Sequence, residues 1–132
     1  MVCRVRLCVL GRSAKNPMIE IKDKARLQHL LSEEEAMLFF HVTWSEYSTI
    51  SKGMIEMVER YAKMGEYPTK FYQGTFEGDL IELTQSLTEL GVPDQAFGGN
   101  GSLALFKCGK LTGFIQSVIG EGNHSVWKLI KP

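Results

Sequence analysis

Two serines three residues apart follow a tryptophan in the segment HVTWSEYST, residues 41–49. Ser45 and Ser48 stand where an apolar run passes into a helical pattern. A serine becomes a nucleophile only when a base lies within hydrogen-bond reach, and the histidine nearest in sequence is His41. Residues four apart in a strand lie about 13 Å apart along it, so His41 is not expected to activate Ser45. Both serines are predicted to be helix caps.

The three cysteines offer few further possibilities. Cys3, Cys8 and Cys108 form no CxxC pair and no cluster with histidine, so neither a disulfide framework nor a metal site is expected, and no cofactor is indicated. Cys3 and Cys8 would lie on opposite faces of one strand. Cys108 is interpreted as an exposed turn residue. The alternative is a reactive thiolate, favoured by Lys107 and Lys110.

Length and charge narrow the class of protein. A chain of 132 residues with 44% hydrophobic residues is predicted to form one globular domain. Its net charge is zero, which argues against a nucleic-acid binder. No apolar stretch approaches the length of a membrane-spanning helix. Residues 31–100 carry four basic and twelve acidic residues, a net of −8, which is interpreted as solvated helix faces.

The first segment, residues 1–17, is predicted to be an extended arm. Its basic residues are Arg4, Arg6, Arg12 and Lys15. The first acidic residue of the chain is Glu20, and an Arg-rich, acid-free start is typical of a mitochondrial presequence. We expect this arm to be retained and to lie on a partner through its three arginines.

Strand patterns alternate with helix patterns along the remainder, residues 18–132, which predicts an α/β sheet covered by helices. Strands are predicted at 18–21, 36–42, 69–76, 102–107 and 111–118, and helices at 23–32, 49–64, 80–90 and 123–132. Asp23 is a predicted helix cap, as is Asp79 in a pair with Glu82. In the second helix an apolar row recurs at helical spacing and is predicted to face the core, with an interface as the alternative for its three methionines. Its members are Ile50, Met54, Met57, Tyr61 and Met64.

This order of elements resembles that of the thioredoxin family over about residues 18–131. The resemblance is carried by the apolar strand leading to Trp44, by the frame SEYS at 45–48, and by SLALFKCGKLTGFIQSVIG at 102–120. It implies a thioredoxin-like fold, with a central mixed sheet flanked by helices, preceded by the N-terminal arm.

The sequence departs from the family at the positions that carry its redox chemistry. In the family, a thiolate at a helix N-terminus attacks a disulfide and a second thiol three residues on resolves it. Those positions hold Ser45 and Ser48 here, and hydroxyls form no disulfides. The family's buried acid aligns with Phe39 and its cis-proline with Gly101. The resemblance therefore implies a member that has lost redox activity.

The preferred function is a non-catalytic accessory subunit of a larger protein assembly, peripheral to a mitochondrial membrane complex such as a respiratory or ATP-synthase complex. Phe97, in the loop 93–101, is a candidate partner anchor. Trp44 is expected to pack over the helix end, with a role in covering a binding groove as the alternative.

Three other functions remain open. One is a cytoplasmic or axonemal scaffold. Another is a glutathione or peptide binder that uses the surface beside Ser45 and Gly101. The last is a thiol-dependent enzyme that uses Cys108.

Overall fold

A computed structural model describes residues 18–76 and 81–130 of the chain. Its elements, in chain order, are β1 (Ile19–Ile21), α1 (Lys24–Leu31), β2 (Glu35–His41), α2 (Glu46–Met64), β3 (Lys70–Thr75), α3 (Ile81–Glu89), the 3-10 turn η1 (Asp94–Phe97), β4 (Ser102–Lys107), β5 (Lys110–Ile115), α4 (Val118–Glu121) and α5 (Asn123–Ile130). The predicted arm, residues 1–17, and the predicted cap Asp79 lie outside the described residues.

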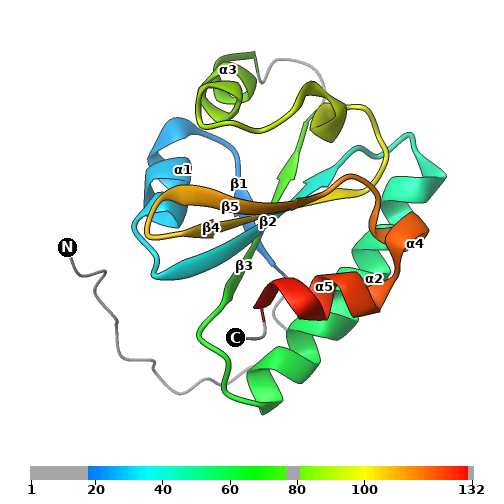
Figure 1. The fold of residues 1–132 in the computed structure, drawn as a ribbon. Helices are drawn as coiled ribbons and strands as arrows, with labels where there is room; N and C mark the ends of the chain where they lie inside the picture. Colours follow the sequence, from blue (N-terminus) through cyan, green and yellow to red (C-terminus); the bar gives the residue numbers. More distant parts are fainter. Residues whose placement is uncertain (1–17, 77–80, 131–132) are drawn as a thin grey trace.

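The five strands form one mixed sheet in the order β1-β3-β2-β4-β5 (Figure 1). Strands β1, β3 and β2 run parallel, whereas β4 is antiparallel to β2 and β5 to β4. Strand β2 lies at the centre, and residues 36–41 are all buried. A continuous apolar run suits this position because both faces of the strand are covered. The predicted α/β class and mixed sheet are confirmed.

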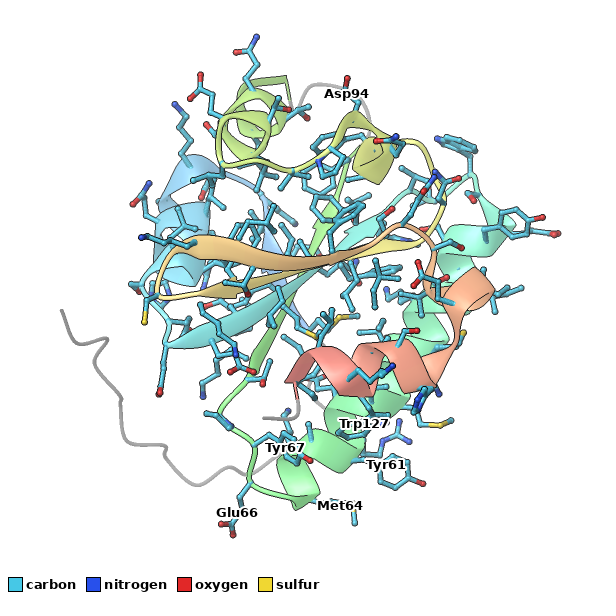
Figure 2. All side chains as sticks on the ribbon, viewed as in Figure 1. Tyr61, Met64, Glu66, Tyr67, Asp94 and Trp127 are labelled. Carbon is cyan, nitrogen blue, oxygen red and sulfur yellow. The ribbon has the colours of Figure 1, made fainter. Side chains whose placement is uncertain are left out.

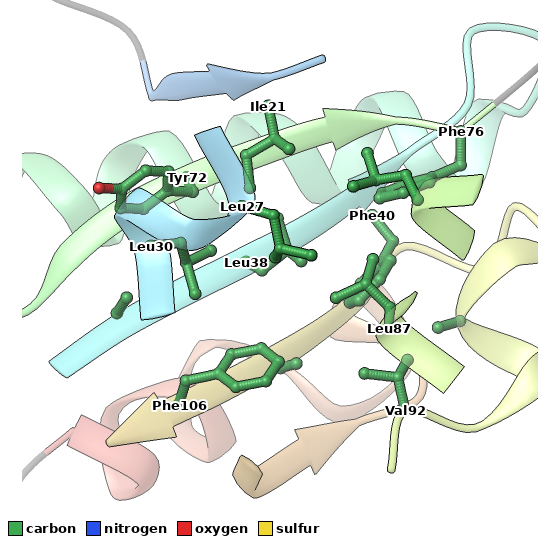
Figure 3. Close-up of a cluster of buried hydrophobic side chains, with 14 residues drawn as sticks. Ile21, Leu27, Leu30, Leu38, Phe40, Tyr72, Phe76, Leu87, Val92 and Phe106 are labelled. Carbon is green, nitrogen blue, oxygen red and sulfur yellow. The ribbon is translucent and has the colours of Figure 1, made fainter. Parts of the chain in front are cut away.

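Helices cover both faces of the sheet and create two separate cores. On one face, Leu27 and Leu30 of α1 and Leu87 of α3 pack against the strands (Figure 3). On the other face, Ile55 of α2 and Val126 of α5 meet the second cluster, which includes α4. Because each helix contributes one apolar side, the two-sided burial of β2 follows from this three-layer arrangement.

Helix starts agree with the sequence where a capping side chain marks them. The Asp23 carboxylate accepts a hydrogen bond from the N–H of Arg26 at 2.9 Å, which confirms the predicted cap of α1. Two helix starts differ from the prediction. Helix α2, predicted from residue 49, begins at Glu46. The strand predicted at 111–118 ends at Ile115. The short helix α4 follows instead, with Ser117 as its N-cap.

Helix α2 buries a different side from the one predicted. The core side consists of the buried residues Ser48, Ser51, Ile55, Val58, Glu59 and Ala62. Four members of the predicted row face outward instead, with exposed fractions of 50% at Ile50, 46% at Met57, 55% at Tyr61 and 72% at Met64. The fifth member, Met54, is partly buried and packs against the second core. Tyr47, 60% exposed, extends this row. We call Tyr47, Ile50, Met54, Met57, Tyr61 and Met64 the α2 stripe.

The error has a simple geometric reason. Every residue of the α2 stripe except Met64 directly precedes a core residue, so the two rows lie about 100° apart around the helix. Both rows have helical spacing, and the outer one is the more apolar.

No helix in the described parts of the chain is long and apolar enough to cross a membrane.

The two isoleucines of α2 give a matched test of this assignment. Ile55 is fully buried and Ile50 is half exposed. We expect Ile55→Ala to lower the free energy of unfolding by about 2–5 kcal/mol because it leaves a cavity. Ile50→Ala should change it by less than about 0.5 kcal/mol. Urea denaturation at low protein concentration measures both, and equal losses would contradict the observed orientation of α2.

Candidate functional site

The candidate site lies where β2 ends and α2 begins. The chain leaves β2 at His41, turns through Thr43 and Trp44, and enters α2 at Glu46. Ser45 has extended backbone angles, φ −105° and ψ 128°, and its Oγ accepts a hydrogen bond from the N–H of the residue three positions on, at 3.2 Å. This geometry confirms that Ser45 is the N-cap of α2.

The Ser45 hydroxyl is also covered from outside the helix. It donates a hydrogen bond to the carbonyl oxygen of Gly99 at 2.6 Å, and the residue is only 8% exposed. A hydroxyl has one proton to donate. Since that proton points at Gly99, Ser45 has none to transfer to a base without breaking the contact.

Glycines in the loop before β4 allow this close approach. Gly99 has a φ of +82°, and a Cβ built on it would lie 2.8 Å from Cη2 of Trp44 and 3.2 Å from Cβ of Ser45. A side chain at this position would displace the loop from the start of α2. The backbone of the loop therefore closes the place where a substrate would reach the helix N-terminus.

Gly101 occupies the position where the family resemblance implies a cis-proline. It has a φ of +72°, and a Cβ there would overlap the side chain of Ser51 and lie 3.1 Å from the carbonyl oxygen of Tyr47. The N–H of Val118 donates to the Gly101 carbonyl at 2.9 Å. Gly101 thus joins the first turns of α2 to the start of α4.

Ser48 is not a helix cap, which corrects the prediction. Its Oγ lies 2.8 Å from Nδ1 of His41 and accepts a hydrogen bond from the N–H of Val42 at 3.0 Å. Sequence reasoning tested His41 only against Ser45, along the strand. The missed pair arises because α2 folds back, so that its first turn lies over the end of β2. Ser48 has no exposed surface, and this Ser–His pair is therefore sealed from any substrate.

Two aromatic residues of the predicted degenerate site have opposite surroundings. Phe39 is fully buried in the core beneath α2, and its ring stacks with that of His41 at a centroid distance of 6.0 Å. Trp44 is 70% exposed, so it does not pack over the helix end as expected. Only its ring edge approaches the loop, at Gly99.

Phe97 is partly buried, whereas the sequence suggested an exposed side chain, and its role as a partner anchor stays a prediction. Its ring makes edge-to-face contacts with Phe40 and Phe76, at centroid distances of 5.5 and 5.2 Å. Phe97 thereby closes one end of the core covered by α1 and α3. The aromatic side chain therefore fastens the loop 93–101 to the domain.

Cys108 lies far from the start of α2. Its N–H donates to the carbonyl of Glu34 at 3.0 Å, and the neighbouring Lys107 pairs with Glu35 at the first residue of β2. The thiol is exposed, as predicted, but at the opposite end of the sheet from Ser45.

Other predicted residues lie outside the description or form no cluster. Cys3, Cys8, Arg4, Arg6 and Arg12 belong to the undescribed segment. Within residues 18–76 and 81–130, no three His, Cys, Asp or Glu side chains are grouped as a metal site would require.

Two acidic groups with shifted pKa values also lie away from the site. Burial raises the pKa of Glu59, in the middle of α2, although the Lys63 ammonium 3.4 Å away opposes the shift. Burial likewise raises the pKa of Tyr72, whose hydroxyl donates to the Glu33 carboxylate at 2.6 Å. Neither group contacts Ser45, so neither supplies acid–base chemistry there.

These features define a thioredoxin fold in which the loop before β4 covers the N-terminus of α2. Comparison with solved structures agrees: the thioredoxin of Trypanosoma brucei brucei superposes with a TM-score of 0.67 and 13% identity, covering 94% of this chain and 100% of that one. Mitochondrial thioredoxin 3 of Saccharomyces cerevisiae, in an oxidised form, gives 0.62 and 16%, covering 86% and 92%.

A thioredoxin f2 in complex with ferredoxin:thioredoxin reductase is also similar, with a TM-score of 0.65 and 11% identity over 86% of this chain and 94% of that one. No family model and no curated protein matches the sequence. Identities this low establish the fold, and the function has to be argued from the residues themselves.

Ser48 provides a test of the buried hydrogen bonds at the site. Ser48→Ala leaves the N–H of Val42 without its acceptor and removes the partner at His41 Nδ1. We expect it to lower the free energy of unfolding by about 1–3 kcal/mol. Thr49→Ala, on the exposed side of the same turn, should cost less. Chemical denaturation compares the two, and a larger loss in the Thr49 variant would contradict the arrangement.

The close packing of the loop 93–101 can be tested by substitutions that each add one methyl group. Gly101→Ala forces a side chain into Ser51 and into a left-handed backbone, so we expect a loss of about 1–3 kcal/mol. Gly98→Ala is the matched control, because its nearest contact would be an ordinary 3.6 Å and its φ is −98°. Thermal unfolding of both variants would contradict the described loop if Gly98→Ala were the more destabilising.

Proposed function

We propose that this chain is a non-catalytic, thioredoxin-fold subunit of a larger protein assembly. The observation that carries the proposal is the state of the two serines at the start of α2. Ser45 caps α2 and donates a hydrogen bond to the Gly99 carbonyl, and Ser48 is buried and hydrogen-bonded to His41. Dithiol exchange needs a thiolate and a second thiol at these positions, and buried hydroxyls supply neither.

The remaining thiol of the described chain does not replace them. Cys108 has no cysteine beside it in the described residues, and it lies at the far end of the sheet. An activity of this thiol alone is the second candidate function, favoured by its exposure.

A module without its own chemistry acts through its surfaces. The α2 stripe exposes a row of large apolar side chains, and Trp44 extends it beyond the start of the helix. Exposed apolar areas of this kind mark interaction sites in soluble domains. The similar thioredoxin f2 was solved in complex with a reductase, which illustrates that this fold can dock on a protein partner.

A mitochondrial membrane complex, of the respiratory chain or ATP synthase, is the proposed location. Its support is the composition of residues 1–19, which contain three arginines and a lysine and no acid. The proposed contact is peripheral, through the basic arm. A cytoplasmic or axonemal assembly is the alternative, and the same module would serve there as a scaffold.

An insulin-reduction assay tests the loss of redox chemistry. We expect the wild-type chain to give no turnover above buffer, equal to Ser45→Ala and to a variant with Cys3, Cys8 and Cys108 changed to serine. Turnover in the wild type that Ser45→Ala abolishes would contradict the closed site. Turnover that only the cysteine-free variant loses would instead support a thiol-dependent enzyme.

Fractionation of cells that express the full chain with a C-terminal tag tests its placement. We expect it to migrate with other subunits in a native complex of mitochondrial membranes. A monomer with no co-migrating partner would overturn the assembly. Co-migration in a cytoplasmic fraction would overturn the location alone.

A further inference from the structure

The α2 stripe is an exposed apolar surface that the packing of the described domain does not explain. Its outward direction is visible at Tyr61 and Met64, which point away from the body of the protein (Figure 2). Taking about 200 Å² for a large exposed side chain, the stripe leaves roughly 600 Å² uncovered. That area reaches the upper end of what monomeric proteins typically expose in one patch.

The residues of the stripe are arranged almost symmetrically about Met54. Tyr47 lies seven residues before it and Tyr61 seven residues after it. Ile50 lies four before and Met57 three after. A second α2 running antiparallel would set each Tyr47 against Tyr61 of the other copy, and each Ile50 against Met57. The stripe is therefore complementary to itself, as a two-fold contact requires.

Charges along the outer edge of the stripe are arranged symmetrically about a centre one residue earlier, at Gly53. Glu46 and Arg60 are both exposed, and they lie seven residues before and seven after Gly53. On the helical wheel they fall on the side of the stripe away from the core. The antiparallel arrangement brings Glu46 of one copy opposite Arg60 of the other, twice by symmetry. Such rim pairs fix orientation more than they add affinity.

Gly53 supplies an independent indication of a close neighbour. It is exposed in the middle of α2, and a Cβ built on it would meet nothing within 4 Å. Glycine weakens a helix interior, and no described contact within the chain requires it here. Between Glu46 and Arg60, however, a residue without a side chain lets a second helix backbone approach closely.

We infer that the α2 stripe is the contact surface of a homodimer in which a second copy docks antiparallel, with the two-fold axis beside Gly53 and Met54. With roughly 600 Å² from each copy, the contact would bury about 1,200 Å² in total, which is the lower limit for a stable interface. The surface between β2 and the loop before β4 takes no part, so the dimer does not depend on the loss of redox chemistry.

Sedimentation of the purified full chain tests the dimer. Between about 1 and about 200 µM we expect the dimer fraction to rise by mass action. Tyr61→Glu places a charge in the apolar contact of each copy and should weaken association about tenfold or more. Gln85→Glu adds the same charge on the exposed side of α3 and should leave association unchanged. Thermal unfolding confirms that each variant is folded.

Charge reversal distinguishes this contact from other uses of the stripe. Glu46→Arg and Arg60→Glu each create two like-charge contacts in a homodimer and should weaken it. Mixing the two single variants creates opposite-charge contacts at both positions, so a mixed dimer should form more readily than either homodimer. A mixture that associates no better than the separate variants overturns the antiparallel arrangement.

Two other results would also overturn the inference. The first is a dimer that Tyr61→Glu leaves intact. The second is a chain that remains monomeric at the highest concentration. If Tyr61→Glu then releases other subunits from the native complex, the occupant of the stripe is a different protein. The proposed accessory function would stand in that case, whereas the homodimer would not.

Discussion

The hydrogen bond from the Ser45 hydroxyl to the Gly99 carbonyl is the contact on which the closed site depends. The same oxygen accepts the N–H of Ser48, so one small side chain holds together the turn after β2, the first turn of α2 and the loop before β4. A thiolate at this position would have no proton to give to Gly99. The closed geometry and a reactive sulfur at residue 45 are therefore mutually exclusive.

The order of elements and the class of the sheet could be predicted because each strand and helix carries its own periodicity. The buried side of α2 could not be. Its core row contains Ser48 and Ser51, whose hydroxyl and small size serve the close contacts with β2 and Gly101, whereas the outer row carries methionine and tyrosine. The hydropathy of a side chain shows whether it can be buried. Which row of α2 is buried depends on the shape of the sheet and loop that it packs against. The turn of α4 was missed because Val118 and Ile119 favour a strand.

Part of the candidate site could also be predicted from the sequence. Ser45 as a helix cap follows from its residue type and from the helix that begins after it. The pairing of Ser48 with His41 depends on the angle at which α2 returns over β2, and the inward turn of Phe97 depends on the aromatic gap between Phe40 and Phe76. Such tertiary placements have no signature in local spacing.

Strand β1 lies at one edge of the sheet, and this position affects how the chain tolerates proteolytic trimming from its N-terminus. Its three residues pair with residues 72–74 of β3, some fifty residues further along the chain. Met18, just before it, is buried in the core beneath α2. Proteolytic trimming that stops short of residue 18 leaves the five described strands in place. Trimming past residue 21 uncovers the N–H and C=O groups along β3, and a raw edge of that kind recruits foreign strands and leads to aggregation.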